Sequence, residues 1–157
     1  MYMKKKKRIA LVAHDNRKKD LLDWVDWNWE SLSKHELICT GTTGSLIDTL
    51  LNKKRSDAHL SSVNIKKLKS GPLGGDQQLG ALISDEKIDL LIFLWDPMQP
   101  QPHDVDVKAL LRIAVLYNIP MACNRSTADF IISSNLFEGD YKRQVKDYSS
   151  YIKREIF

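Results

Sequence analysis

Short runs of apolar residues alternate along the chain with longer segments in which apolar residues recur every three or four positions. A continuous apolar run is typical of a strand buried on both faces, and the longer period is typical of a helix with one face on a sheet. The predicted strands cover 8–13, 36–40, 63–68, 88–95 and 119–124. The predicted helices cover 18–34, 45–53, 76–83, 107–118 and 126–133, with Ser126 or Thr127 as the cap of the last one. A terminal helix is suggested by Tyr148, Tyr151, Ile152 and Phe157.

This alternation of strands and helices, joined by connections of a few residues, predicts an α/β fold. We expect a single-domain, open, mostly parallel five-stranded sheet with helices on both faces, a Rossmann-like arrangement. The chain has 157 residues, 43% of them hydrophobic, which suits one domain with a proper core and is short for two. We place this domain at residues 8–157 and predict a basic, disordered tail over residues 1–7.

The net charge of +4 is concentrated near the N-terminus, because much of the excess lies between Lys4 and Arg8. A solvated tail explains this run. No other basic stretch carries the interleaved aromatic residues of a protein that binds single-stranded nucleic acid. We therefore expect no nucleic-acid partner, and instead an attraction for small anions such as phosphates.

The two cysteines indicate a reducing compartment. Cys39 and Cys123 are far apart and each lies in an apolar stretch, which is typical of buried, reduced thiols. No zinc-binding spacing is visible, so we expect no metal. The apolar run from Ile9 to Ala13 is too short for a membrane span and has no small-residue cleavage site. These features predict a cytoplasmic protein without a membrane partner.

Polar side chains follow the predicted strands at the points where the strands end. In open α/β sheets, ligands bind beyond the carboxyl ends of the strands, so these side chains are candidates for one site. They are His14 and Asp15, the run Thr40 to Thr43, the glycine-rich turn 70–76, Asp96, and the run Asn124 to Thr127.

Asp76 is the most informative of these residues, because it follows three glycines at the start of a predicted helix. Glycines let a ligand approach the main chain, and free N–H groups at a helix start suit an anion. A carboxylate at this position can also simply cap the helix. Likewise, Thr42 or Thr43 can serve as an ordinary cap instead of holding a phosphate.

Other candidates also have simpler explanations. His14 can be a surface loop residue, Asp104 and Asp106 can be partners of a helix dipole, and Asp96 before a proline can shape a turn. Their shared edge of the sheet favours a common site.

Carboxylates with imidazoles indicate proton transfer, since a carboxylate can act as a base while a neutral imidazole polarises a carbonyl. We find no nucleophile elbow, Walker loop or dinucleotide fingerprint. The spacing therefore favours cofactor-free acid/base chemistry on a small phosphorylated carbonyl compound.

Five motifs in order along the chain resemble those of the methylglyoxal synthase family, over residues from about Arg8 to Phe137. The motifs are Val12-Ala13-His14-Asp15, Thr40-Gly41-Thr42-Thr43-Gly44, Ser70-Gly71-Pro72-Leu73-Gly74-Gly75-Asp76-Gln77-Gln78, Trp95-Asp96-Pro97, and His103-Asp104-Val105-Asp106 with the residues that follow to Arg112. The resemblance implies conversion of dihydroxyacetone phosphate to methylglyoxal and inorganic phosphate, without metal or other cofactor. It also implies a homohexamer that phosphate inhibits.

The resemblance further implies roles for individual residues. Asp76 would be the base that removes a C3 proton, His103 would polarise the carbonyl and move protons between oxygens, and Asp106 and Asp96 would position them. The residues that match the substrate and phosphate contacts of the family are His14, Lys18, Thr40, Thr42, Thr43, Ser70 and Gly71. Asp15 matches a further site residue whose role we leave open.

The C-terminus departs from the family. An arginine that reaches the site of a neighbouring subunit is replaced by Glu155 in the gapless register, with Arg154 beside it. Arg154 is therefore a candidate for a phosphate contact across subunits.

Two alternatives remain: a regulatory ligand-binding domain, which would not need Asp76 and His103 together, and the related cyclohydrolase domain that acts on purine ribonucleotides. Both normally belong to longer chains, so we expect the free-standing enzyme.

Overall fold

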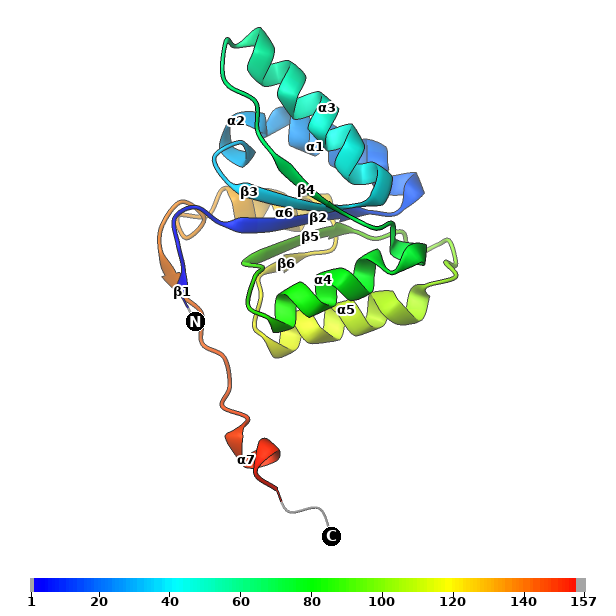
Figure 1. The fold of residues 1–157 in the computed structure, drawn as a ribbon, viewed down its shortest axis with the longest axis vertical. Helices are drawn as coiled ribbons and strands as arrows, with labels where there is room; N and C mark the ends of the chain where they lie inside the picture. The colour runs from blue at the N-terminus through cyan, green and yellow to red at the C-terminus, as the bar shows by residue number, and fades with distance from the viewer. Residues whose placement is uncertain (1, 155–157) are drawn as a thin grey trace.

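The computed structural model describes residues 2–154, and its centre is a five-stranded parallel sheet (Figure 1). The strand order is β4-β3-β2-β5-β6, with every neighbouring pair parallel. The strands are β2 (Arg8–Ala13), β3 (Glu36–Thr40), β4 (Ile65–Leu68), β5 (Leu90–Leu94) and β6 (Met121–Ala122). The predicted fold class is therefore confirmed.

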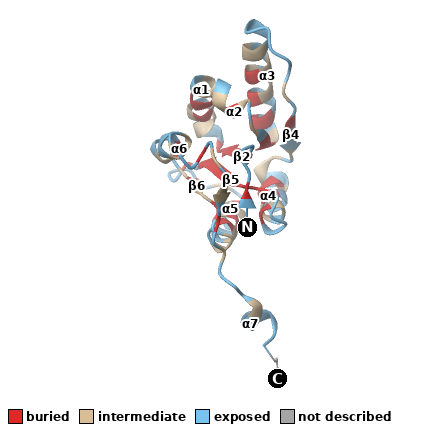
Figure 2. Ribbon diagram, turned by 90° about the vertical axis from the view of Figure 1, so that its left-hand side faces the viewer, coloured by how far each residue is buried: buried red, intermediate tan, exposed pale blue. Residues whose placement is uncertain are grey.

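Helices cover both faces of the sheet (Figures 1 and 2). One face packs against α1 (Lys18–Trp27), α2 (Trp29–Leu32), α3 (Gly41–Asp57) and α6 (Arg125–Ile132). The other face packs against α4 (Gly75–Ser84) and α5 (Asp104–Leu116). Two short 3-10 turns, η1 (Asp15–Arg17) and η2 (Gly71–Leu73), lead into α1 and α4.

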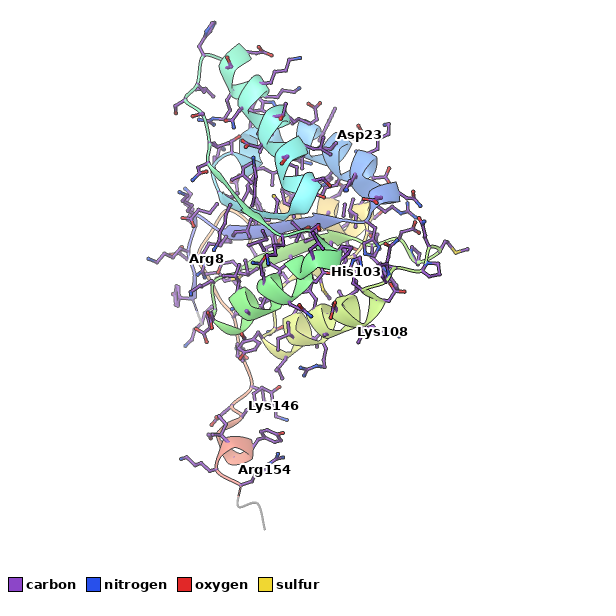
Figure 3. The ribbon with its side chains drawn as sticks, turned by 45° about the vertical axis from the view of Figure 1, so that its right-hand side comes forward. Arg8, Asp23, His103, Lys108, Lys146 and Arg154 are labelled. Atoms are coloured by element: carbon purple, nitrogen blue, oxygen red, sulfur yellow. The ribbon has the colours of Figure 1, made fainter. Side chains whose placement is uncertain are left out.

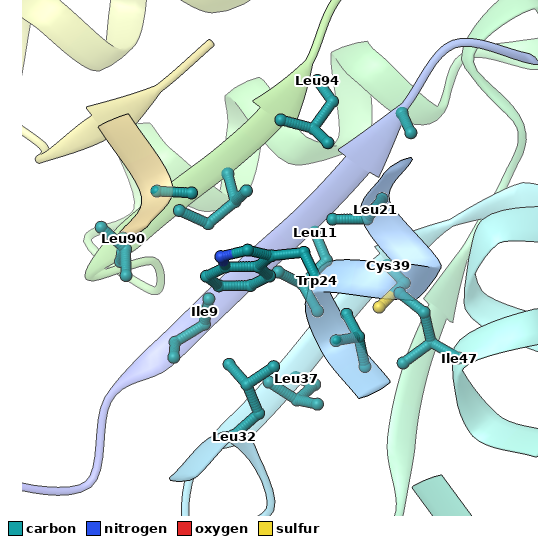
Figure 4. Packing of buried hydrophobic residues seen from close by; sticks show 14 of the residues in the cluster. Ile9, Leu11, Leu21, Trp24, Leu32, Leu37, Cys39, Ile47, Leu90 and Leu94 are labelled. Carbon is teal, nitrogen blue, oxygen red and sulfur yellow. The ribbon is translucent and has the colours of Figure 1, made fainter. Parts of the chain in front are cut away.

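Two hydrophobic cores result, because alternate residues of a strand point to opposite faces. In β2, Ile9 and Leu11 belong to one core while Ala10 and Val12 belong to the other. Trp24 lies over the first pair and is 2% exposed (Figure 4). Its indole nitrogen donates to Asp129 Oδ1 at 2.9 Å, so the one polar group of this buried side chain has a hydrogen-bond partner. Burying a large apolar side chain of this kind stabilises the fold by roughly 2–3 kcal/mol.

Several helix boundaries differ from the predictions. The predicted helix 18–34 divides at Asn28, whose side chain donates to the Trp24 carbonyl and ends α1. The glycine- and threonine-rich stretch from Gly41 is not a separate turn but the first turn of α3. The cap of α6 is Asn124 and not Ser126 or Thr127, since its Oδ1 accepts a hydrogen bond from Thr127 N.

The predicted disordered tail is wrong for residues 2–7. The strand β1 (Tyr2–Met3) pairs with β7 (Tyr141–Lys142) in an antiparallel sheet, and Met3 is buried. Lys7 is also buried, because its ammonium donates to the carbonyls of Lys4 and Gly139. Long lysine side chains bury their stems when the charged end finds such acceptors. Charge alone therefore does not predict exposure here.

The C-terminal segment after β7 extends away from the sheet and ends in the short α7 (Ser149–Ile152) (Figure 1). Phe157, assigned to the predicted terminal helix, and Glu155 lie outside the described residues. Cys39 is buried, Cys123 is partly buried, and both are free thiols. None of the helices within residues 2–154 has the length and apolar character needed to cross a bilayer.

Candidate active site

A polar cavity of about 70 Å³ lies at the carboxyl end of the sheet, where the strand order reverses around β2. From β2 the chain runs outward through β3 and β4, then returns to add β5 and β6 on the other side. Such a reversal leaves a crevice between the loops that follow adjacent strands, and ligands bind there. The lining residues are Val12, Ala13, His14, Asp15, Lys18, Thr40, Gly41, Thr42, Thr43, Ser70, Gly71, Pro72, Asp76, Gln101 and His103.

One wall of the cavity is the N-terminus of α3. Thr40 is the N-cap, and the first N–H groups of a helix have no partner in the preceding turn. Gly41 has φ +44°, and a Cβ atom there would lie 2.8 Å from Ser70 Cα, so only glycine fits. This close approach brings Ser70 against the helix start. Hydroxyl groups and free amides together suit a phosphate.

Lys18 adds a cation to this wall. Its ammonium lies 2.6 Å from Thr42 Oγ1 and 2.6 Å from Asp15 Oδ1. The hydrogen bond from Lys18 lowers the pKa of the Asp15 carboxyl, which is itself exposed. Lys18 is thus held at the cavity by a threonine of α3 and a carboxylate of its own turn. This arrangement favours an anionic ligand beside Thr42.

The opposite wall brings Asp76 and His103 together. Asp76 lies in the first turn of α4, as predicted, and Asp76 Oδ2 is 3.4 Å from His103 Nε2. The two residues are 2% and 8% exposed. Burial raises the pKa of the Asp76 carboxyl, and the nearby His103 opposes this shift. Gly71 makes the approach possible, because a Cβ atom there would lie 2.7 Å from His103 Nε2.

His14 lies between the two walls with a defined tautomer. The main-chain N–H of Asp96 donates to His14 Nδ1 at 3.2 Å, so Nδ1 is the acceptor and the proton of a neutral ring is on Nε2. Burial, followed by the charge of His103, lowers the pKa of His14 and favours the neutral ring. The rings of His14 and His103 meet edge to face at 5.6 Å. His14 therefore offers one N–H donor to the cavity.

Two of the predicted catalytic residues, Asp96 and Asp106, do not line the cavity. The carboxylate of Asp96 accepts hydrogen bonds from Asn16 Nδ2 and Met98 N. Asp106 accepts one from Gln77 Nε2 at 3.2 Å. Both carboxylates lie beside residues of the site without reaching the cavity. This placement agrees with the expectation that they position Asp76 and His103, and their roles remain predictions.

Other candidates lie elsewhere. The run Asn124 to Thr127 follows the edge strand β6 and does not line the cavity. Arg154 stacks on the Tyr151 ring at 3.8 Å in the extended C-terminal segment, away from His103 (Figure 3). Gln101 also lines the cavity and is not among the site residues predicted from the sequence. Its position two residues before His103 was the one available signal.

The comparison with known proteins agrees with these motifs. The family description "MGS-like domain" matches residues 21–123. A methylglyoxal synthase of Maridesulfovibrio salexigens is 60% identical over 98% of this chain and 100% of its own length. The chain belongs to the methylglyoxal synthase family. A methylglyoxal synthase of Oleidesulfovibrio alaskensis is 55% identical over 97% of each chain.

A solved structure extends the likeness to the fold. The crystal structure of methylglyoxal synthase from Elizabethkingia anophelis NUHP1 matches with a TM-score of 0.85 and 50% identity. The match covers 99% of this chain and 96% of that one. Similarity to the methylglyoxal synthase family thus spans nearly the whole chain, beyond the stretch from Arg8 to Phe137 that carries the motifs. Among residues 2–154, no group of three or more His, Cys, Asp or Glu side chains is placed to hold a metal ion.

Proposed function

We propose that the chain is a methylglyoxal synthase, which eliminates inorganic phosphate from dihydroxyacetone phosphate through an enediolate and uses no cofactor. The observation that carries this proposal is the buried pair Asp76 and His103, 3.4 Å apart, which shares one cavity with Lys18 and the start of α3. A base, an imidazole and an anion site are the three parts that the reaction requires.

Asp76 is the base in this proposal. It takes a proton from C3, and the electron pair of the C–H bond forms the C2–C3 double bond of the enediolate. Burial supports this role, because a carboxylate with a raised pKa is a stronger base than an exposed one. His103 and the Nε2–H donor of His14 would stabilise the oxygen on C2, and His103 would move protons between the two oxygens.

The second step breaks the bond between C1 and the phosphate oxygen. The C3 hydroxyl loses its proton, the C3–O bond becomes a carbonyl, the double bond moves to C1–C2, and the electron pair of the broken bond leaves with phosphate. The product is an enol that tautomerises to methylglyoxal. Overlap requires the C1–O bond to stand perpendicular to the enediolate plane. The threonines, free amides and Lys18 would hold phosphate there and stabilise its growing charge, by a few kcal/mol for each well-aimed donor.

We further propose a homohexamer in the cytoplasm, with phosphate inhibition that depends on Arg154. Large apolar side chains on the surface support self-association: Trp27, Val105 and Phe130 are each about 80% exposed. The C-terminal segment carries Arg154 away from His103 of its own chain (Figure 3), which suits a contact with a neighbour. Sedimentation would give the number of subunits, and an Arg154→Ala variant with weaker phosphate inhibition would support the contact.

The test is turnover of dihydroxyacetone phosphate by the purified chain, with and without a chelator. The expected result is methylglyoxal and inorganic phosphate in equal amounts at a rate that the chelator does not change. Formation of glyceraldehyde 3-phosphate without phosphate release would instead indicate an isomerase. Phosphate binding without any turnover would favour the regulatory domain considered above.

A further inference from the structure

The segment that leads to His103 has little packing of its own. Residues 95–102 connect β5 to α5 and project from the carboxyl end of the sheet (Figure 1). Met98 is 86% exposed, and Pro97, Gln99 and Pro100 are exposed as well. Because such a segment buries little apolar surface, its position depends on hydrogen bonds to the rest of the fold.

Asn16 supplies most of these hydrogen bonds. Apart from bonds to the adjoining turn of α5, three hydrogen bonds reach the segment from other parts of the described chain. Asn16 Nδ2 donates two of them, to Asp96 Oδ2 at 2.9 Å and to Gln99 Oε1. The third joins Asp96 N to His14 Nδ1. The segment is therefore fastened to the end of β2 both at its start and in its middle.

The carboxylate of Asp96 has both oxygens engaged in this connection. Oδ2 accepts from Asn16, and Oδ1 accepts from Met98 N at 3.0 Å. The Asn16 hydrogen bond, followed by that of Met98, lowers the pKa of Asp96, so the group is an ionised acceptor. The hydrogen bond from Asn16 to the Asp96 carboxylate therefore also helps to fix the main chain of Asp96.

The main-chain amide of Asp96 in turn fixes His14. A donor facing Nδ1 excludes a proton there, because two N–H groups would then oppose each other. The proton stays on Nε2, which is buried in the cavity and has no hydrogen-bond partner within the described residues. The titratable groups around the ring are His103, Asp104, Asp96 and Asp15.

We propose that Asn16 is a positioning residue of this site. By holding Asp96 and Gln99 it keeps the Asp96 amide against His14 Nδ1, which maintains the Nε2–H form of His14 and the position of His103. Asn16 lines no part of the cavity and touches no reacting atom, so it acts through these residues. The kinetic arm of the test rests on the proposed function, and the spectroscopic arm does not.

The kinetic arm compares Asn16→Ala and Asn16→Asp with Asn135→Ala, an exposed asparagine remote from the cavity. Asn16→Asp places an oxygen where Asp96 Oδ2 and Gln99 Oε1 need a donor, so it should be the more damaging change. We expect a loss in kcat of roughly 10- to 100-fold, because a displacement of about 1 Å in a catalytic group has this effect. KM for the phosphorylated substrate should change less, and Asn135→Ala should match the parent.

The spectroscopic arm measures the tautomer of His14 with ¹⁵N-labelled histidine. The parent and Asn135→Ala should show an unprotonated Nδ1 and a protonated Nε2 at neutral pH. Asn16→Asp should show exchange between tautomers or a protonated ring. A parent with its proton on Nδ1 would overturn the proposal even if turnover is absent. Lower thermal stability of the Asn16 variants, with unchanged kcat and unchanged His14 signals, would also overturn it and leave Asn16 a purely structural role.

Discussion

Buried polar residues lie at both ends of the strand pair β2 and β5, but their hydrogen bonding differs between the two ends. At the amino end, Asp89 precedes β5 and meets Arg8 at the start of β2. The Asp89 carboxylate accepts hydrogen bonds from Arg8 N, Nε and Nη2 at 2.8–3.0 Å. At the carboxyl end, the described residues leave Asp76 Oδ2, His14 Nε2 and His103 Nδ1 without hydrogen-bond partners, although all three atoms are buried.

This difference in hydrogen bonding indicates that the amino end contributes to stability and the carboxyl end to function. A buried carboxylate that accepts three hydrogen bonds and pairs with a guanidinium contributes to the fold, because most of its hydrogen-bonding capacity is used within the chain. A buried polar atom without a partner destabilises the fold until a ligand satisfies it. The amino end therefore holds the strands in register, while the carboxyl end keeps polar atoms available for substrate.

Asp76→Asn should have the largest effect, and it acts on the carboxyl end alone. The amide cannot remove a proton from carbon, so kcat should fall roughly 10²- to 10⁴-fold. Phosphate binding should be unchanged or tighter, because the variant lacks one negative charge near the anion site. Turnover and phosphate titration on the same preparations measure both quantities. Unchanged turnover would remove Asp76 from the role of base.

Gly71→Ala should come next. The new Cβ would lie 2.7 Å from His103 Nε2 and 3.1 Å from Asp76 Oδ2, so one of these groups must move. We expect a loss in kcat of roughly 10- to 100-fold with an intact fold. Gly80→Ala in α4 is the control, since its Cβ would meet only Ile113 Cγ2 of α5 at 4.0 Å. Equal activity of the two variants would show that His103 and Asp76 tolerate displacement.

Asp89→Asn tests the amino end and should change stability instead of turnover. The loss of charge beside Arg8 should lower the free energy of unfolding by about 2 kcal/mol, since this carboxylate is buried and its partner is partly exposed. Urea unfolding measures the change, with Asp23→Asn as the control. Asp23 forms an exposed ion pair with Lys19, so its substitution should leave the free energy of unfolding almost unchanged. A large fall in kcat for folded Asp89→Asn would contradict the separation of the two ends.

Sequence patterns predicted the parts of the molecule that local residues determine. The apolar runs predicted β2, β3, β5 and β6, because a strand buried on both faces needs apolar residues at every position. The alternation of Val63, Ile65 and Leu68 predicted β4, in which two lysines are exposed. The glycines before Asp76 correctly indicated a helix start, and the parallel sheet then brought His14, Thr40 and Asp76 to one edge. These inferences need only the pattern of neighbouring residues and the rule that ligands bind beyond the carboxyl ends of parallel strands.

The remaining features depend on contacts between distant residues. Asn16 and Asp96 are separated by 80 positions, and no periodic pattern links them. Lys7 is buried because a carbonyl 132 positions away accepts a hydrogen bond from its ammonium, which a run of lysines does not indicate. Gln101 lines the cavity although it lies in the connection between β5 and α5 and does not directly follow a strand. Such contacts come from the tertiary structure, so the sequence predicted the site's composition better than its supporting hydrogen bonds.

The smallest effect that we predict is a gain in stability from Asp76→Asn, which the comparison of the two ends requires. Burial raises the folded pKa of Asp76, so the folded state binds this proton more tightly than the unfolded state does. The stability of the parent relative to Asp76→Asn is therefore highest below the unfolded carboxyl pKa and falls as pH rises through the folded pKa. At neutral pH the variant should melt at a higher temperature than the parent, and this difference should disappear as the pH falls below the unfolded carboxyl pKa. Thermal unfolding across this pH range, with the exposed Glu30→Gln as the matched control, would contradict the argument if the variant gained nothing at neutral pH or gained as much in acid.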